Sequence, residues 1–296
     1  MGVAGLLGEL PGGSMEETQH GFSQLAILLD GIQRVDLATG MLSYVCALRH
    51  KEAFNAGNYT PSARDFQAQI ITLRLVHRWD FTCVFDGRPP PAKRHEHTRR
   101  RQHNDGVVMT STFIAICANI CRSRFLPYVV APLEADMQIG RRSEGTVAVC
   151  RDSDEVAYGN RLTVIVDSWP KEQYRVIDLD APVSNETRVK HPLFFYYRKF
   201  GIKVFHWWAA VMGCDISENQ SGITGAGKTT FYLAMQEFDV DRPSSLTSRS
   251  FAKKLREHAR RSCRASYSVV KIQRELERVN QWFTKDATFY DESCNE

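Results

Sequence analysis

Short apolar runs alternate with amphipathic segments along the first two thirds of the chain. The apolar runs are of strand length and are bounded by turn or charged residues. They occupy residues 25–29, 81–85, 126–130, 146–150 and 162–166. Apolar residues recur at helical spacing in 63–79 and 111–124, which predicts helices there. Strands that alternate with helices indicate an α/β fold, with a mostly parallel central sheet flanked by helices.

Acidic residues follow most of the predicted strands. In parallel sheets flanked by helices, ligands bind at the carboxyl ends of the strands, where these acids are expected. A single acid in such a place is usually a helix cap or a turn residue, but two acid-x-acid pairs among them are harder to explain in that way. The candidate set is Asp30, Asp86, Glu134, Asp136, Asp152, Asp154 and Asp215.

Carboxylates that are clustered repel one another unless a cation lies among them. Hard divalent cations with oxygen ligands suit such a site, Mg²⁺ above all. Two ions about 3.5–4 Å apart can stabilise the attacking and leaving oxygens of a phosphodiester displacement. The acids therefore suggest transfer of a phosphoryl group to water.

A basic segment follows Asp86. Lys93 and Arg100 are seven positions apart, so they share one face of a predicted helix and could stabilise charge on a phosphate. A solvated basic helix is the alternative. His95 and His97 are interpreted as surface residues rather than metal ligands.

Composition narrows the class of protein without fixing its function. The chain has 296 residues, 43% of them hydrophobic, and a net charge of +4, which is typical of a globular protein with a full core. No apolar run approaches eighteen residues, so no membrane span is expected. The eight cysteines form no Cys-x-x-Cys pair. Most are interpreted as buried, reduced thiols of an intracellular protein rather than zinc ligands or disulfides.

The last part of the chain differs in composition. Residues 241–245 are interpreted as a linker that leads to a basic helical tail. A solvated helix face and a contribution to binding of the nucleic-acid backbone are both open for this tail. Its cations are Lys253, Lys254, Arg256, Arg260, Arg261, Arg264, Lys271, Arg274 and Arg278.

Four motifs in order resemble the XPG/flap-endonuclease family of structure-specific 5′ nucleases. The match runs from Met1 to about residue 238. The motifs are Met1 to Leu6; Val84 to Pro90 with Lys93; 131–138 with 152–159; and Gly213 to Asp215 followed by 222–227. Glu134-Ala135-Asp136 is closer to the exonuclease branch, of the eukaryotic mismatch-repair 5′→3′ type.

The resemblance implies a PIN-like 5′ nuclease fold and a role for each motif. Asp30, Asp86, Glu134 and Asp136 would hold one metal side, and Asp152, Asp154 and Asp215 the other. The ions would be Mg²⁺, with Mn²⁺ able to substitute. Lys93 and Arg100 would contact the scissile phosphate, and Gly2 would lie near the site once Met1 is removed.

The resemblance further implies a helix-hairpin-helix that grips duplex phosphate, with a possible K⁺. Its DNA-binding residues would be Gly222, Gly225, Gly227 and Lys228. The expected division is 1–101 and 110–212 for the nuclease domain, 213–238 for the helix-hairpin-helix and 239–296 for the tail. The expected activity is 5′→3′ exonuclease, flap or junction endonuclease, or both, by a monomer in nuclear DNA repair or replication.

The sequence departs from the family pattern in several places. Asp36, Arg151 and Ile216 replace, respectively, an aromatic or histidine, an acid and a tyrosine. Only residues 102–109 separate the basic helix from the next helix, where relatives carry a helical arch. This puts threading of 5′ flaps in doubt and could favour nicks, gaps, ends or junctions. No sliding-clamp motif is seen.

Two other functions compete with a nuclease. Residues 222–229 match the P-loop pattern, but the polar segment before them is not the strand that nucleotide binding needs. A catalytically inactive relative that binds nucleic acid as a scaffold is the second alternative, although all seven acids are kept. Trp207 and Trp208 could stack on bases, but a core helix is the preferred interpretation.

Overall fold

The computed structural model describes residues 3–12, 18–29, 34–88, 107–140, 146–217, 221–259 and 266–284. The chain divides into two compact units. Of the described residues, those within 18–151 and 160–176 form the sheet unit, and those within 1–17, 152–159 and 177–285 form the helical unit. Each unit is described by itself below.

The sheet has seven strands in the order β1-β7-β6-β5-β2-β3-β4. Parallel pairing joins β6, β5, β2, β3 and β4, whereas β1 pairs antiparallel with β7. The mostly parallel sheet predicted from the sequence is therefore confirmed. The strands are β1 Gln19–His20, β2 Arg34–Ala38, β3 Thr82–Phe85, β4 Tyr128–Val130, β5 Thr146–Cys150, β6 Leu162–Ser168 and β7 Gln173–Asp178.

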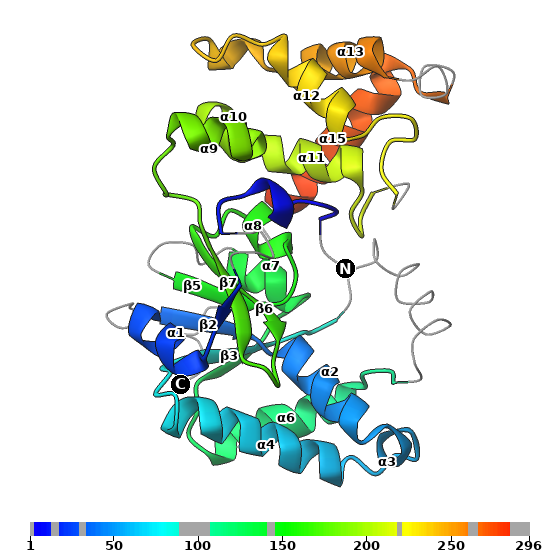
Figure 1. Cartoon of the computed structure of the whole chain (residues 1–296). Helices are drawn as coiled ribbons and strands as arrows, with labels where there is room; N and C mark the ends of the chain where they lie inside the picture. Colours follow the sequence, from blue (N-terminus) through cyan, green and yellow to red (C-terminus); the bar gives the residue numbers. More distant parts are fainter. Residues whose placement is uncertain are drawn as a thin grey trace. The chain divides into compact units, whose positions relative to one another are not determined.

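Helices cover both faces of this sheet. Successive side chains of each strand point to opposite faces, and the side chains on both faces are largely apolar. Cys83 and Phe85 of β3 belong to the large core, whereas Val84 between them packs with Ala135 and Ile139 of α7. Figure 1 shows α2, α3, α4 and α6 together on one side of the sheet unit. The helices are α1 Phe22–Leu29, α2 Thr39–Arg49, α3 Lys51–Asn55, α4 Thr60–Leu75, α6 Ser111–Ser123 and α7 Ala135–Gly140.

Four of the five predicted strands are confirmed, and the first is wrong. Residues 22–29 form helix α1, in which Leu25 and Leu29 are buried while Ile27 is 78% exposed. A half-buried strand would have placed residues 25, 27 and 29 on one face, so the helical period decides the fold here. The fifth predicted strand, 162–166, extends two residues further in the structure, so Asp167 lies within β6. The two predicted helices correspond to α4 and α6.

The helical unit is built around aromatic residues of α11. Trp207 stacks on Phe251 with ring centroids 5.0 Å apart, and Trp208 meets Phe231 edge to face at 5.2 Å. The predicted core helix at this tryptophan pair is confirmed, since both side chains are buried. The elements are η1 Leu7–Glu9, α8 Asp154–Ala157, α9 Asn185–Lys190, α10 Pro192–Phe200, α11 Lys203–Met212, α12 Lys228–Gln236, η4 Pro243–Ser245, α13 Ser248–His258 and α15 Val269–Thr284.

The described parts of the basic tail include the helices α13 and α15, as predicted, and these pack within the helical unit. α15 packs against α11 and α13, and α13 packs against α12. Figure 1 shows α11, α12, α13 and α15 gathered together. The predicted linker contains the single 3₁₀ turn η4. The tail therefore completes a folded unit.

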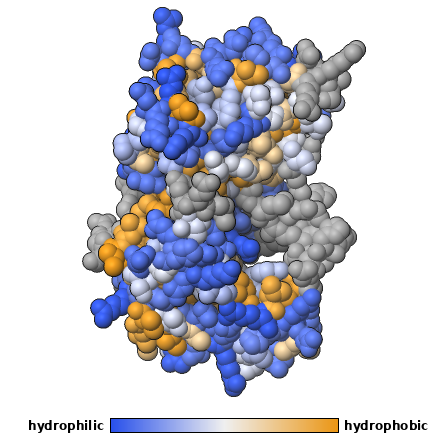
Figure 2. All heavy atoms as spheres, in the orientation of Figure 1, coloured by the Kyte–Doolittle hydropathy of each residue, from blue (hydrophilic) through white to orange (hydrophobic). Residues whose placement is uncertain are grey.

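The six cysteines within the described residues are buried thiols that form no disulfide with one another, as the sequence predicted. Burial raises the pKa of Cys117 to about 12, which keeps this thiol protonated. Cys263 and Cys294 lie outside the described residues. Among the helices that are described, none is long and apolar enough to cross a membrane. The surface in Figure 2 is mostly hydrophilic, with hydrophobic residues in separate small patches.

Candidate functional site

Asp86 lies at the carboxyl end of β3, where the loop after β3 contacts the loop after β4. Its Oδ1 accepts a hydrogen bond from the backbone N–H of Ala135 at 2.9 Å. The backbone of Ala131, just after β4, donates to the carbonyl of Phe85 at 2.9 Å. The carboxylate of Asp86 therefore lies beside the peptide that separates Glu134 from Asp136, and one oxygen caps the start of α7.

Gly87 allows this close approach of the two loops. Its N–H donates to the carbonyl of Leu133 at 2.6 Å. A Cβ at position 87 would lie only 1.7 Å from the carbonyl oxygen of Ala131, closer than any side chain can fit. The Asp-Gly pair of the sequence motif is therefore explained by backbone packing.

Asp36 is a candidate that sequence reasoning assigned to no metal site. It lies on β2 between β3 and β5, its side chain is fully buried, and its Oδ1 accepts from Arg34 Nε at 2.8 Å. After β2 the chain enters α2, where a Cβ on Gly40 would lie 2.9 Å from Asp86 Oδ2. The chain that follows Asp36 thus meets Asp86 at the carboxyl edge of the sheet.

The signal that could have found Asp36 is an acid embedded in the apolar stretch Val35-Asp36-Leu37-Ala38. Asp30 was chosen because an apolar run precedes it, and that run is a helix. Asp30 itself lies outside the described residues. We call Asp36, Asp86, Glu134 and Asp136 the sheet acids.

The remaining candidates, Asp152, Asp154 and Asp215, belong to the helical unit, and we call them the helix acids. Asp154 begins the four-residue helix α8 and is 7% exposed, and Asp215 is 8% exposed. Burial raises the pKa of Cys214 to about 11, and the charge of Asp154 adds to this shift. The residue before Asp215 is therefore close enough to Asp154 to sense its charge.

The N-terminal segment of the chain contacts both parts that carry the helix acids. Ser153 Oγ donates to the carbonyl of Val3 at 3.1 Å, and the N–H of Ala4 donates to the carbonyl of Gly213 at 3.1 Å. The carbonyl of Ala4 accepts from Trp208 Nε1 at 3.0 Å. These bonds fix the segment beside α8 and beside the turn that leads to Asp215.

His206 supports α8 from within the core of the helical unit. Its Nε2 lies 2.9 Å from the carbonyl oxygen of Ala157, at the end of α8, and its Nδ1 lies 2.8 Å from Asn280 Oδ1. The ring also stacks on Phe283 of α15. Burial lowers the pKa of His206, with the hydrogen bonds opposing that shift. The neutral imidazole is therefore the form that the folded chain favours.

The glycine-rich segment 221–227 forms a turn between α11 and α12. Gly222 has a φ of +78°, and a Cβ there would lie 2.2 Å from the carbonyl oxygen of Val211. Gly225 also has positive φ, and Gly227 is the N-cap of α12. Lys228 forms an ion pair with the buried Glu9. Residues 203–217 before the turn are helix and turn, so the strand that a P-loop requires is not found there.

Several predicted site residues lie outside the described residues, namely Gly2, Asp30, Lys93 and Arg100. Within the ranges that the structure describes, no group of three or more His, Cys, Asp or Glu side chains is arranged to hold a metal ion.

Comparison with known proteins identifies the fold. No protein-family model and no curated protein matches the chain. A structure of the catalytic core of Rad2 in complex with DNA substrate aligns with a TM-score of 0.56 and 16% identity, over 92% of this chain and 86% of that one. Flap endonuclease-1 from Methanococcus jannaschii aligns with a TM-score of 0.51 and 14% identity, over 94% and 98%.

A third match is the Holliday junction-resolving enzyme GEN1 in complex with product DNA and Mg²⁺. It aligns with a TM-score of 0.55 and 16% identity, over 96% of this chain and 69% of that one. These alignments extend over both units. The chain therefore has the fold shared by Rad2, flap endonuclease-1 and GEN1.

Proposed function

We propose that this chain is a metal-dependent nuclease that hydrolyses phosphodiester bonds of DNA. One observation carries the proposal: Asp86 binds the amide between Glu134 and Asp136 at the carboxyl edge of the sheet. Ligands of such sheets bind at that edge. The solved structures whose fold is similar to that of this chain include Rad2 with DNA substrate and GEN1 with product DNA and Mg²⁺.

The chemistry of the acids fits divalent metal ions. All of them offer hard carboxylate oxygens, which suit Mg²⁺ or Mn²⁺. Asp36, Asp154 and Asp215 are buried, and the low dielectric there strengthens the attraction between a carboxylate and a divalent cation. In the proposed function the sheet acids would hold one ion and the helix acids another. When bound, the ions would polarise the phosphate and lower the pKa of a water.

Other residues of the chain would bind and orient the DNA. Lys93 and Arg100 would pair with the scissile phosphate, and Gly2 would lie near it. The turn 222–227 would offer backbone groups to a duplex phosphate as a helix-hairpin-helix, with a possible K⁺. Lys228, at the start of α12, is paired with Glu9, so the backbone N–H groups of this helix terminus would make the phosphate contact.

The motif resemblance extends this proposal to substrate and cellular role. The substrate would be duplex DNA with a 5′ end, nick, gap, flap or junction, cut with 5′ polarity by a monomer. The role would be DNA repair or replication in the nucleus.

Cleavage of end-labelled DNAs tests the proposal. Nicked, gapped, flap and junction DNAs are incubated with the full chain in Mg²⁺, Mn²⁺ or EDTA. We expect metal-dependent cutting of at least one of them, and its loss in Asp86→Asn and Asp152→Asn. Asp241→Asn is the matched control, since Asp241 is exposed and far along the chain from either acid group. Failure of the folded wild-type chain to cut any of these DNAs would overturn the proposal.

A further inference from the structure

One face of α15 presents a row of positive charges. Lys271, Arg274 and Arg278 are exposed and occur at positions i, i+3 and i+7, which lie on one side of a helix. The opposite face is anchored in the core of the helical unit. Its buried residues are Ile272, Leu276, Val279 and Phe283. The row is therefore carried on a helix whose other side is fixed.

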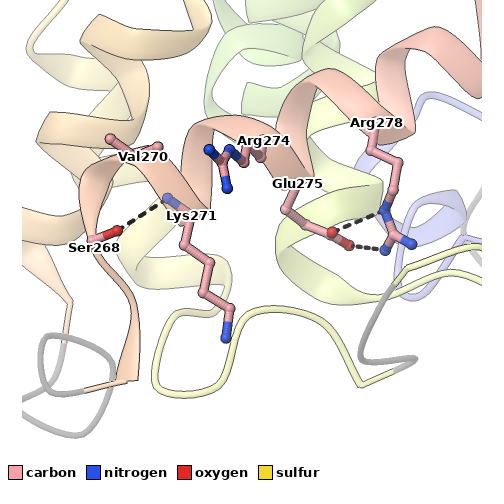
Figure 3. Close-up of a pocket in the computed structure, with 6 residues that line it drawn as sticks. All are labelled: Ser268, Val270, Lys271, Arg274, Glu275 and Arg278. Carbon is pink, nitrogen blue, oxygen red and sulfur yellow. Dashed lines mark hydrogen bonds and ion pairs between the residues drawn. The ribbon is translucent and has the colours of Figure 1, made fainter.

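A pocket of about 380 Å³ follows this row. Figure 3 shows the three cations along α15 and the contact of Ser268 Oγ with the backbone N–H of Lys271. The pocket is lined by Ser268, Val270, Lys271, Arg274, Glu275 and Arg278. The start of the helix and three cationic side chains thus surround one space, and both favour an anion there.

One cation on α15 and one on the neighbouring helix α13 are paired with carboxylates, Arg278 and Lys254 respectively. On α13, Lys254 pairs with Glu237 at 3.3 Å and with Glu257 at 3.1 Å. Among the described residues, no carboxylate pairs with Lys271 or Arg274. Lys271 Nζ instead lies 4.6 Å from the ring centroid of Tyr267. Exposed cations are thus found on both helices, and those of α15 line the pocket.

Glu275 is the one acid that lines the pocket, and it orients a cation. It is 7% exposed, and it forms a two-point contact with Arg278 through bonds of 3.1 Å and 2.7 Å. This contact holds the guanidinium of Arg278 in the row (Figure 3). The pocket therefore keeps a net positive charge from Lys271 and Arg274.

We propose that this pocket binds consecutive phosphates of a nucleic-acid strand. The inference rests on the proposed function, because it assigns a second contact to the same DNA. Seven residues of helix span about 10.5 Å. Phosphates of one strand advance about 3.4 Å along the duplex axis per nucleotide, so the row reaches about three of them. Its cations contact phosphate oxygens, so they fix the position of the strand without reading its sequence.

The salt dependence of DNA binding tests this inference. Binding of the full chain to a labelled duplex is measured by fluorescence anisotropy in EDTA, at several salt concentrations. Each phosphate contact contributes about 0.9 to the slope of log K against log salt. We expect the double variant Lys271→Ala/Arg274→Ala to bind more weakly and to reduce that slope by about 1.8.

The matched control is Arg249→Ala/Lys253→Ala, which removes the same charge from exposed positions of α13. It should leave the slope unchanged within about 0.5, because it removes no phosphate contact. Glu275→Gln should bind DNA more tightly than the wild type, because it leaves the charge of Arg278 unopposed. Equal slopes for wild type and the Lys271/Arg274 variant, or equal losses in both double variants, would overturn the inference.

Two further outcomes keep this inference distinct from the proposed function. If the wild type cleaves DNA and the Lys271/Arg274 variant binds it with unchanged affinity, the phosphate pocket is wrong and the nuclease proposal survives. If the variant weakens binding to anionic lipid vesicles but not to duplex DNA, the row serves a membrane surface and the inference is again overturned. If DNA binding depends on the row but no DNA is cut, the nuclease proposal alone fails.

Discussion

The sheet acids and the helix acids are held in place by different parts of the chain. The sheet acids lie on strand β2 or in the segments that follow β3 and β4, and the backbone pairing of these strands fixes where those segments begin. Asp154 lies on the single turn of α8, Asp152 lies just before it, and Asp215 lies in a short turn after α11. Their positions depend on hydrogen bonds between residues that are far apart in the sequence. Examples are the bonds between Ser153 and the carbonyl of Val3 and between His206 and the carbonyl of Ala157.

This difference predicts how each acid group responds to substitution. The positions of the sheet acids should be sensitive to changes in the local backbone, because the close approach of two loops at Gly87 holds Asp86 beside Ala135. The helix acids should be sensitive to side chains that carry no acid themselves. The three predictions below test this contrast, from the largest expected effect to the smallest.

Gly87→Ala should be the most damaging. Its new methyl group would clash with the carbonyl of Ala131 at 1.7 Å, so the loops at the ends of β3 and β4 must separate. We expect a loss of about 3 kcal/mol or more in the free energy of unfolding, measured by denaturant titration. Gly8→Ala is the control, since a Cβ there meets nothing within 4 Å. Equal stability of the two variants would show that the loops after β3 and β4 can separate at little cost in free energy.

Arg34→Met should be intermediate in effect. It removes the hydrogen bond from Nε to the buried carboxylate of Asp36, at a cost of about 1–3 kcal/mol. The double variant Arg34→Met/Asp36→Asn should recover part of that loss, because it also removes the buried charge. Thermal unfolding with and without Mg²⁺ measures both effects. If the double variant is as unstable as the sum of the two single variants, Arg34 acts on stability independently of Asp36.

His206→Gln should have the smallest effect, with a distinct pH dependence. Burial lowers the pKa of His206 in the folded chain below the ordinary value of about 6.5. The unfolded chain therefore binds the proton more readily, so stability is full above about pH 6.5 and falls as the pH drops below it. Denaturant titrations between about pH 7.5 and 5.5 should show a shallower fall in the variant. Parallel pH profiles would contradict this assignment.

The sheet could be predicted because its pattern is local. The apolar runs at β3, β4, β5 and β6 are each followed by turn or charged residues, and parallel strands bury both faces. The run 25–29 misled because a continuous apolar stretch fits a strand or a helix, and only burial on one face separates them. β2 was not predicted because Arg34 and Asp36 interrupt its apolar pattern.

The candidate site was predictable only in part, for the same physical reason. Asp86 directly follows β3, and Glu134 and Asp136 come four and six residues after β4, so their meeting at one edge can be inferred from sequence. The setting of Asp154 depends on Val3 and His206, which are about 150 and 50 positions away. No local pattern encodes such contacts. The closeness of Gly87 to Ala131 is likewise a property of the folded loops.

Single-turnover cleavage tests most directly the claim that both acid groups serve one reaction. The rate is measured on the best-cut DNA as a function of Mg²⁺ for wild type, Asp36→Asn and Asp154→Asn, with DNA binding measured separately in Ca²⁺. Both variants should lose at least about 10²-fold in rate while binding DNA within about threefold of the wild type. A variant of either group that binds DNA normally and keeps the wild-type rate would contradict the account.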